Sequence, residues 1–181
     1  MFGRVAGDVG RDVTTPSDGP GPETNPCGVR HTCPGAVVCG MQSVTVSRRV
    51  DAPPDRVREL MADLEAFMLG AGFTDVTVSG PEIHLENQVG LATVTLDLRV
   101  VEREDAALAY EQADGFFETM TTVYTLDAVD GGTEVTATTE FALDLALVGQ
   151  ILDATVIKRQ RTSELESQFD WLEAQVAGDG A

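Results

Sequence analysis

The chain contains few of the residues that most often carry catalytic chemistry. None of its three cysteines lies beyond residue 40, and of its two histidines only His84 does. The part after residue 40 therefore offers no thiol nucleophile and cannot build a multi-histidine metal site. The sequence also lacks the G-x-S-x-G motif of serine hydrolases, a phosphate-binding glycine loop and a dinucleotide-binding fingerprint. These absences exclude many catalytic classes, and we expect no cofactor.

Long apolar runs are missing as well. No segment is long enough to cross a bilayer. The first residues also lack the apolar stretch behind basic residues that marks a signal peptide. We therefore expect a cytoplasmic protein without an integral membrane segment.

Positive charge is scarce. Lys158 is the only lysine, and 12 basic residues stand against 30 acidic ones, which gives a net charge of −18. The acids are dispersed, which indicates an acidic surface and predicts no nucleic-acid partner. The composition resembles that of proteins from halophilic archaea, where molar salt shortens the Debye length to about 3 Å and screens the self-repulsion. The alternative is an ordinary acidic protein.

Residues 1–40 differ from the rest of the chain. They are rich in proline and glycine and show no periodic apolar pattern. Such a composition cannot bury enough surface to offset chain entropy. We expect either a disordered arm or an extension upstream of a true start at Met41.

This first segment holds Cys27, Cys33 and Cys39, together with His31. Four soft ligands within thirteen residues could bind zinc. Their spacing matches none of the common zinc patterns, and no helix or strand is predicted beside them to orient the ligands. We therefore predict no metal site.

Residues 41–178 are predicted to form one domain that starts with a strand and a helix. Valines alternate with polar residues from Val44 to Val50, which indicates a strand with one buried face. Pro53 and Pro54 end this strand and begin an amphipathic helix, predicted over residues 55–68.

Six further strands follow. Alternating apolar residues predict strands over 73–79, 82–87, 89–102, 106–113, 116–127 and 133–143. Asp130-Gly131-Gly132 predicts the last hairpin turn, and Ser79-Gly80-Pro81 an earlier one. Short connections imply an antiparallel sheet.

A long helix is predicted over residues 147–177. Apolar residues recur at helical spacing along it, from Leu147 to Val176. The fold class is thus α+β, with a curved seven-stranded antiparallel sheet wrapped around a long C-terminal helix.

The order of these elements resembles the SRPBCC superfamily, which includes START domains and polyketide cyclase/dehydrase-like proteins. The matching features are Val50-Asp51-Ala52-Pro53 before the first helix, Gly131-Gly132-Thr133 followed by Glu134-Val135, and the terminal amphipathic helix. Relatives often carry a tryptophan in the first helix, whereas the only one here is Trp171. The resemblance implies a helix-grip fold with an apolar cavity between sheet and helix, and it implies no single chemistry.

Polar residues that could act in such a cavity are few. His84 and Glu86 share a strand face opposite Ile83 and Leu85, so they face solvent unless the register is reversed, in which case they would form an acid/base pair. Tyr110 and Tyr124 face inward, where each could pack in the core or orient a ligand oxygen.

Two cations follow the inward pattern. Lys158 lies in a polar gap of the long helix, beside Arg159 and Arg161, and could hold an anionic or carbonyl group or reach the surface instead. Arg48 is in phase with the inward valines of the first strand and has the same two alternatives.

Three functions remain open. The first is a module that binds or carries a small hydrophobic molecule such as a lipid, isoprenoid or polyketide-like compound. The second is a cyclase or dehydratase with a tyrosine as proton donor, and the third is a regulatory partner protein. A monomer and a homodimer are both compatible with the sequence. No catalytic residue can be assigned, and the predicted ligand-binding residues are Leu96, Tyr110, Met120, Tyr124, Phe141, Lys158 and Phe169.

Overall fold

The computed structural model describes residues 40–89, 92–143 and 154–179. Apart from Gly40, residues 1–40 lie outside the described residues. The predictions of a disordered arm or upstream extension, and of no zinc site at Cys27, Cys33 and Cys39, concern that segment. The elements in chain order are β1 (Gln42–Val50), α1 (Pro54–Ala62), α2 (Leu64–Gly70), β2 (Asp75–Ser79), β3 (Glu82–Val89), β4 (Ala92–Val100), β5 (Leu108–Asp114), β6 (Phe117–Val129), β7 (Gly132–Leu143) and α3 (Ala154–Asp179).

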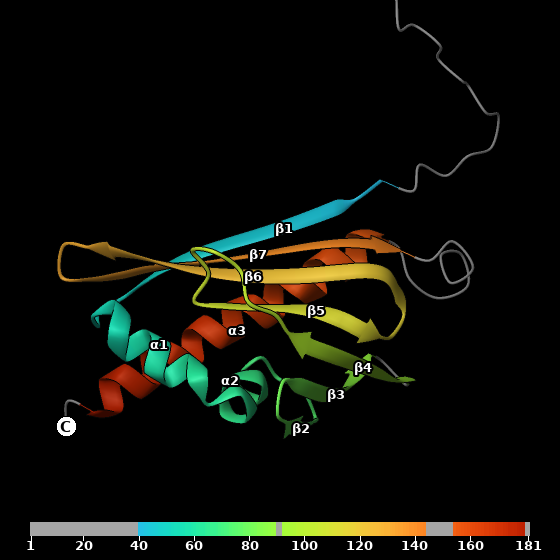
Figure 1. The fold of residues 1–181 in the computed structure, drawn as a ribbon, viewed down its shortest axis with the longest axis horizontal. Coiled ribbons are helices and arrows are strands. Elements are labelled where there is room, and N and C mark those ends of the chain that lie inside the picture. The colour runs from blue at the N-terminus through green and yellow to red at the C-terminus, as the bar shows by residue number, and fades with distance from the viewer. Residues whose placement is uncertain (1–39, 90–91, 144–153, 180–181) are drawn as a thin grey trace, which may run out of the picture. The chain divides into compact units, whose positions relative to one another are not determined.

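The strands form one antiparallel sheet of seven strands in the order β1-β7-β6-β5-β4-β3-β2. The first strand therefore pairs with the last, and all other neighbours in the sheet are neighbours in the sequence. Helix α3 runs along one face of the sheet, with α1 and α2 beside it (Figure 1). This arrangement confirms the predicted α+β fold with a sheet around a C-terminal helix.

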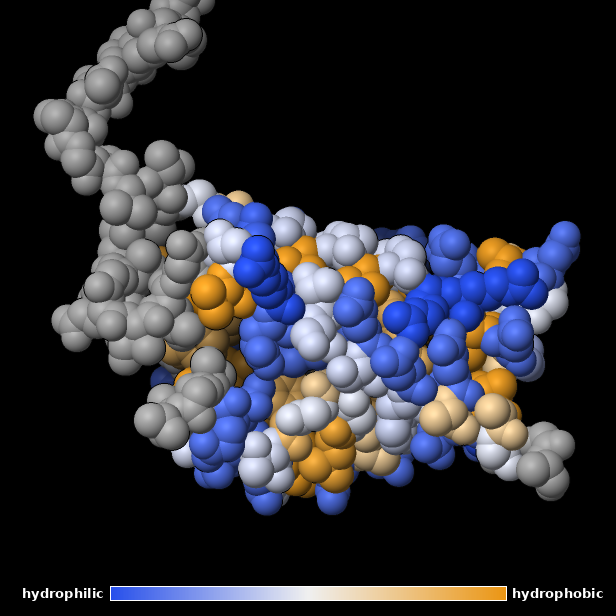
Figure 2. Space-filling view, turned by 180° about the vertical axis from the view of Figure 1, so that it is seen from behind, coloured by the Kyte–Doolittle hydropathy of each residue, from blue (hydrophilic) through white to orange (hydrophobic). Residues whose placement is uncertain are grey.

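Alternation along the strands explains which face is buried. In β7, Val135, Ala137, Thr139 and Phe141 are fully buried, while the residues between them face outward. The outer face carries hydroxyls that pair across strands, for example Thr45 with Thr138 at 3.1 Å. On the side shown in Figure 2, hydrophilic side chains cover most of the surface, with smaller apolar patches between them.

The β6–β7 hairpin joins the sheet to the start of α1. The turn places Gly131 at a φ of 79°, a conformation that favours glycine. Next to it, Thr133 donates a 2.7 Å hydrogen bond to the carbonyl oxygen of Ala52. The hairpin predicted from Asp130-Gly131-Gly132 is confirmed, and it fixes the strand-to-helix turn that Pro53 and Pro54 begin.

The prediction of one helix over residues 55–68 is wrong. Asp63 leaves the helical region, with φ −78° and ψ 79°, and separates α1 from α2. Its carboxylate accepts a 3.2 Å hydrogen bond from the backbone N–H of Ala66 and so caps α2. The break lets both helices bury apolar side chains, including Met61 and Phe67.

Several predicted bounds are also wrong. Strand β2 begins at Asp75 instead of residue 73, and Val89 ends β3 instead of starting the next strand. Strand β6 continues to Val129, two residues past the predicted end. For the long helix, the described residues start at Ala154 and continue to Asp179, and the predicted start at Leu147 lies outside them.

Within the residues that the structure describes, none of the helices is both long and apolar enough to cross a membrane.

Candidate ligand-binding pocket

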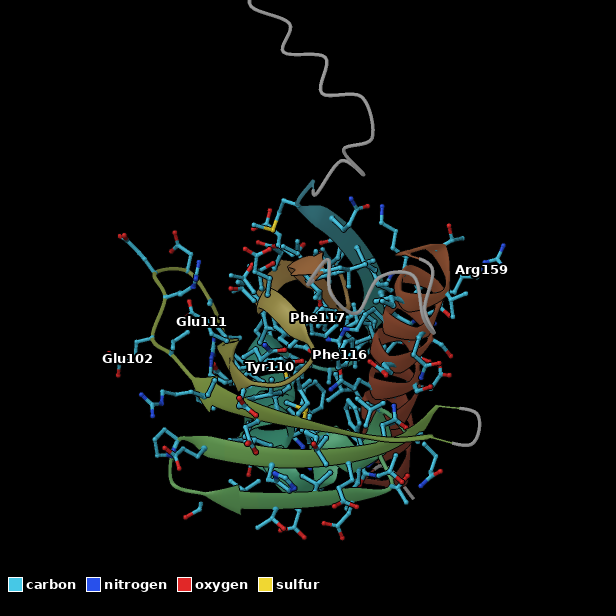
Figure 3. The ribbon with its side chains drawn as sticks, turned by 90° about the vertical axis from the view of Figure 1, so that its right-hand side faces the viewer. Glu102, Tyr110, Glu111, Phe116, Phe117 and Arg159 are labelled. Carbon is cyan, nitrogen blue, oxygen red and sulfur yellow. The ribbon has the colours of Figure 1, made fainter. Side chains whose placement is uncertain are left out.

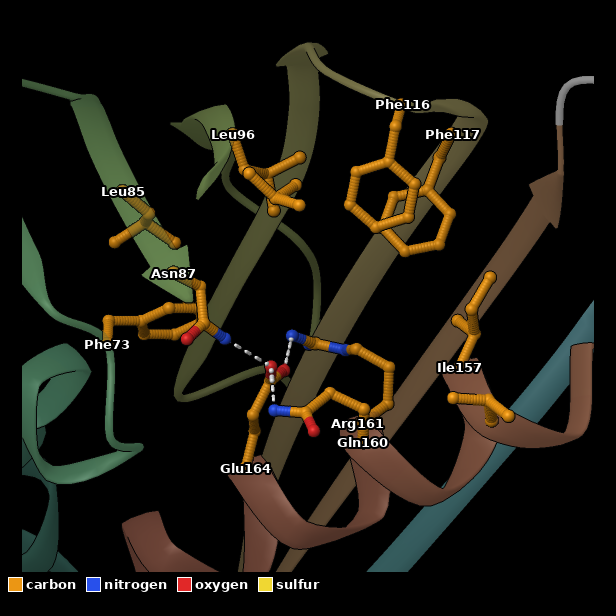
Figure 4. Close-up of a pocket in the computed structure, with 12 residues that line it drawn as sticks. Phe73, Leu85, Asn87, Leu96, Phe116, Phe117, Ile157, Gln160, Arg161 and Glu164 are labelled. Atoms are coloured by element: carbon orange, nitrogen blue, oxygen red, sulfur yellow. Dashed lines mark hydrogen bonds and ion pairs between the residues drawn. The ribbon is translucent and has the colours of Figure 1, made fainter. Parts of the chain in front are cut away.

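A pocket of about 70 Å³ lies between the sheet and the first part of α3. Its lining comes from β3, β4, the β5–β6 connection, the start of β6, the segment before β2, and α3. Most of the lining is apolar, as shown by Phe73, Leu85, Leu96, Phe116, Phe117 and Ile157 (Figure 4). Two further lining residues, Val94 and Val156, are only partly buried or exposed, so the pocket opens to the surface beside them.

An aromatic wall, formed by Phe116 and Phe117, closes one side of the pocket. Their ring centroids lie 4.0 Å apart at an interplanar angle of 34°. Phe117 is buried and packs on Phe141 at 5.2 Å, whereas Phe116 is half-buried. In Figure 3 both rings lie near the centre of the molecule, while Glu102 and Arg159 project at its periphery.

The turn between β5 and β6 sets the position of this wall. Gly115 has a φ of 153°, and a Cβ there would lie 2.5 Å from Leu96 Cδ1. Only glycine therefore fits without displacing a neighbour. The Gln112 side chain then bridges the turn, donating to the Phe117 carbonyl oxygen at 2.8 Å and accepting from the Phe117 N–H at 3.3 Å.

The polar wall of the pocket consists of Asn87, Gln160, Arg161 and Glu164. Its centre is an ion pair in which Arg161 Nη1 lies 2.5 Å from Glu164 Oε2, with both side chains less than a tenth exposed. The three-residue spacing puts the two on one helix face. Glu164 Oε1 also accepts from Asn87 Nδ2 and from Gln160 Nε2, each at 3.1 Å. The buried carboxylate is thus well supplied with donors.

Arg161 also reaches the sheet. Its Nη2 donates to the hydroxyls of Thr139 at 3.3 Å and Thr122 at 3.4 Å, and these two hydroxyls are 2.9 Å apart. Burial by itself would lower the pKa of Arg161, but the Glu164 carboxylate and two nearby tyrosines raise it by more. The net effect raises the pKa, so the guanidinium stays charged. Its Nε is buried and has no hydrogen-bond partner among the described residues.

Tyr110 and Tyr124 form a buried chain next to Arg161. Their hydroxyls lie 3.2 Å apart, and Tyr124 donates to Gln168 Oε1 at 2.6 Å. Gln168 Nε2 in turn donates to the sulfur of Met68 at 3.6 Å. Burial raises the pKa of Tyr124 well above its usual value, and the neighbouring Tyr110 raises it further. Neither tyrosine is among the pocket-lining residues.

The seven residues predicted to bind a ligand lie in different environments. Leu96 lines the pocket. The large core side chains Tyr110, Met120, Tyr124, Phe141 and Phe169 are all buried, at 2% exposure or less, and are not part of its lining. Lys158 is half-buried and is not part of the lining either. The structure brings Tyr110 and Tyr124 together, and it sets Met120 opposite Phe141 in the sheet.

Sequence reasoning missed the residues that make the pocket distinctive. It noted the polar gap in the last helix but assigned it to Lys158, whereas the buried cation is Arg161. The useful signal was spacing, because Arg161 stands four residues before the buried Leu165 and three before Glu164. The paired phenylalanines after Gly115 also went unassigned, since a turn does not reveal which wall it will form.

Two further candidate residues from the sequence, His84 and Arg48, lie outside the pocket. His84 is on the outer face, with its side chain 44% exposed and its Nδ1 2.5 Å from the carboxylate of Asp97, so the predicted solvent-facing register is confirmed. Arg48 forms ion pairs with Asp170 and Glu173 of α3 and does not line the pocket. Among the described residues, no cluster of three or more histidine, aspartate or glutamate side chains could hold a metal ion.

Comparison with solved structures places the fold. A protein of Thermus thermophilus, TTHA0849, is similar with a TM-score of 0.63 and 19% identity, covering 77% of this chain and 100% of that one. The Zhui aromatase/cyclase from Streptomyces sp. R1128 is similar with a TM-score of 0.62 and 19% identity, covering 76% and 96%. A START superfamily protein from Mycobacterium smegmatis has a TM-score of 0.59 and 14% identity, covering 76% and 97%.

These identities support the shared fold alone, and a comparison with curated proteins by sequence finds no match. The model of one family, described as polyketide cyclase/dehydrase and lipid transport, matches residues 41–177. That match covers nearly all of the predicted domain, and it agrees with the helix-grip arrangement of sheet and α3. The chain therefore belongs to the polyketide cyclase/dehydrase and lipid transport family.

Proposed function

We propose that this protein binds a small, mainly apolar molecule in the pocket between the sheet and α3. The observation that carries the proposal is the combination of apolar walls with one polar wall around Arg161 and Glu164. Apolar burial supplies affinity, at about 25 cal/mol per Å² before association costs, and a few polar groups set orientation. Membership of a family described by lipid transport as well as cyclase chemistry supports this class of ligand.

The size of the pocket limits how such a ligand is held. Its volume of about 70 Å³ is well below the roughly 300–1,000 Å³ typical of sites that enclose a whole drug-sized molecule. The ligand therefore inserts one end, and the remainder leaves through the opening beside Val94 and Val156. A lipid, an isoprenoid or a polyketide-like chain with one compact end meets this requirement.

A cyclase or dehydratase is the second candidate, and it is favoured by a buried cation in the pocket wall. Arg161 could polarise a carbonyl oxygen as charge develops there. The proton donors that this chemistry would need are less well placed, because Tyr110 and Tyr124 do not line the pocket. The raised pKa of Tyr124 also makes it a weak acid at neutral pH. Binding without turnover is therefore the better supported proposal.

Co-purified small molecules provide the test. The full-length protein is purified, analysed by native mass spectrometry, then denatured and extracted. We expect an apolar molecule in stoichiometric amount. Val156→Trp, which narrows the opening, should reduce its occupancy several-fold. Val129→Trp is the matched control, because Val129 is also an exposed valine but lies at the far end of β6.

Two outcomes would count against the proposal. Equal occupancy in the two tryptophan variants would place any ligand outside the pocket. A protein that is empty and also binds no added apolar probe would favour the regulatory, protein-binding role.

A further inference from the structure

A second hollow, of about 330 Å³, lies on the outer face of the sheet across β2, β3, β4 and β5. It shares no lining residue with the pocket between the sheet and α3. Its polar lining, which defines the outer hollow, consists of Thr77, Ser79, Glu82, His84, Asp97 and Asp114. All of these side chains can accept a hydrogen bond, and no lysine or arginine is among the lining residues.

A bulge between β4 and β5 brings two carboxylates together in the outer hollow. Asp97 lies opposite Asp114, and the register shifts at the next pair, which leaves Ala113 as an extra residue in β5. Ala113 and Asp114 therefore both border the hollow, and the short side chain of the alanine leaves space beside the acids. Like charges directly opposite each other destabilise a sheet, so a cation between the two carboxylates would be stabilising.

His84 supplies a third acceptor, which distinguishes this place from a mere pair of acids. It lies opposite Asp97, and its Nδ1 is 2.5 Å from Oδ1 of that carboxylate. In the neutral ring Nδ1–H donates this bond, so Nε2 carries the lone pair. Within the described part of the chain, neither Nε2 nor the carboxylate of Asp114 has a hydrogen-bond partner. Thr77 lies opposite His84 on the other side and adds a hydroxyl.

The type of cation follows from the spacing of these groups. No cluster of described histidine, aspartate and glutamate side chains could hold a metal ion, which needs donor atoms roughly 2.0–2.6 Å away. An N–H group reaches its acceptor at about 2.7–3.2 Å and therefore suits a wider set of acceptors. The three N–H groups of a primary ammonium match two carboxylates and one imidazole nitrogen in number.

We propose that the outer hollow binds a small primary alkylammonium, which donates to Asp97, Asp114 and His84 Nε2. The net charge of −18 raises the local concentration of cations at the surface and so assists binding. This site is independent of the proposed function, because it lies on the other face of the sheet.

Proton binding by His84 should compete with the ammonium. The charged groups around the ring on the outer face are Glu82 and Glu86 of β3, Asp75 of β2, Asp97 and Arg99 of β4, and Asp114 of β5. Acids therefore prevail, and the hydrogen bond to Asp97 is the main cause of the raised pKa of His84. Protonation turns Nε2 into a donor and offsets the charge of Asp97, so binding should weaken as pH falls through this pKa.

The experiment compares three butyl compounds by NMR titration of the full-length protein, at constant ionic strength and at a pH where His84 is neutral. Butylammonium carries a charge and three N–H donors, butyltrimethylammonium carries the charge alone, and 1-butanol carries no charge. We expect butylammonium to shift the signals of His84 and Asp114 to saturation. It should bind about fivefold more tightly than either of the other two compounds.

Three variants at exposed positions assign the effect. Asp114→Asn should weaken the binding of butylammonium about fivefold. Asp127→Asn is the matched control, because Asp127 also lies directly opposite an acid, Glu134, but does not border the outer hollow. It should change the affinity less than about twofold, since it removes only a distant charge. His84→Gln keeps an acceptor that cannot titrate, so its binding should no longer depend on pH in this range.

The contrary results are distinct. Equal affinity for butylammonium and butyltrimethylammonium would show a general attraction of cations to an acidic surface and would overturn the site. Equal weakening by Asp114→Asn and Asp127→Asn would place the cation elsewhere and would overturn it as well. Neither result affects the pocket between the sheet and α3, so the proposed function is tested separately.

Discussion

The two halves of α3 face the same sheet but have different surroundings. In the closed half, residues 165–176, Leu165, Phe169 and Leu172 have no exposed surface. In the open half, residues 154–164, Ile157, Arg161 and Glu164 are each 6% exposed and line the pocket. The closed half is covered by α2 as well as by the sheet, and Phe67 packs there on Tyr124 and Trp171 at 5.4 and 6.0 Å.

Under the proposed function, the two halves divide the work of one helix between stability and ligand binding. Apolar contacts in the closed half hold α3 on the sheet and need no ligand. The open half buries a charged pair, which packed apolar residues could replace with equal or greater stability. The proposed function gives these polar groups a role in recognition that folding alone does not require.

The largest expected effect is at the centre of the closed half. Phe169→Ala should lower the free energy of unfolding by about 3–5 kcal/mol, because it leaves a cavity in packed core. Ile157→Ala, in the open half, should cost about 2 kcal/mol or less, because its side chain already borders a pocket. Urea denaturation at equal salt measures both, and equal losses would show that the two halves do not differ in packing.

Breaking the buried ion pair should have the next largest effect. Glu164→Gln leaves the Arg161 guanidinium buried without its carboxylate, at an expected cost of about 3 kcal/mol. The double variant Arg161→Met with Glu164→Leu should recover most of that loss, since it buries no charge. A double variant as unstable as the single one would show that the pair is structural, which would weaken the distinction between the two halves.

A smaller effect is expected at Tyr124, which donates a hydrogen bond to Gln168 of the closed half. Tyr124→Phe removes the hydroxyl that donates to Gln168 and contacts Tyr110, and should cost about 1–2 kcal/mol. Because the pKa of Tyr124 is raised, its phenolate should form at a higher pH than that of an ordinary tyrosine. An alkaline titration followed by phenolate absorbance measures this. A normal titration of Tyr124 in the folded protein would mean that solvent reaches the closed half.

The smallest effect is expected on the outer face, away from both halves. The hydrogen bond to Asp97 raises the pKa of His84 above its ordinary value of about 6.5. Its stabilising contribution is therefore complete below the unfolded pKa and disappears as pH rises through the folded pKa. Both side chains are nearly half exposed, so salt should reduce the effect. NMR titration of His84 should show a lower pKa in Asp97→Asn, and an unchanged pKa would exclude the pair as its cause.

The sequence predicted the sheet well because its strands are buried on one face only. In β7 every second residue from Val135 to Phe141 is buried, so alternation alone identified the strand and its orientation. The break at Asp63 was missed because apolar spacing continues through it from Met61 to Phe67. The available signal for a new helix start was Asp63 itself, because aspartate is a preferred N-cap residue and here accepts from the N–H of Ala66 three residues later.

The pocket was less predictable than the fold, because its lining does not follow the apolar spacing that identifies buried strands and helices. The spacing of apolar residues along the strand and the helix correctly identified Tyr124 and Phe169 as buried. Spacing alone cannot distinguish a side chain in the packed core from one in the wall of a pocket. Arg161 was named only as a neighbour of Lys158, because the sequence does not show which cation of the polar gap is buried and paired with Glu164 in the folded protein. Pairs of opposite charge three residues apart within an apolar stripe would have been the better guide.

The glycine turn that carries the aromatic wall has a consequence for how this scaffold can change. Gln112 holds the turn through the backbone of Phe117, and Gly115 sets its shape, so neither contact depends on the ring of Phe116. Position 116 can therefore accept a smaller, larger or polar side chain without altering the turn. Under the proposed function, ligand preference can then diverge by single substitutions, while the core around Phe169 keeps the fold intact.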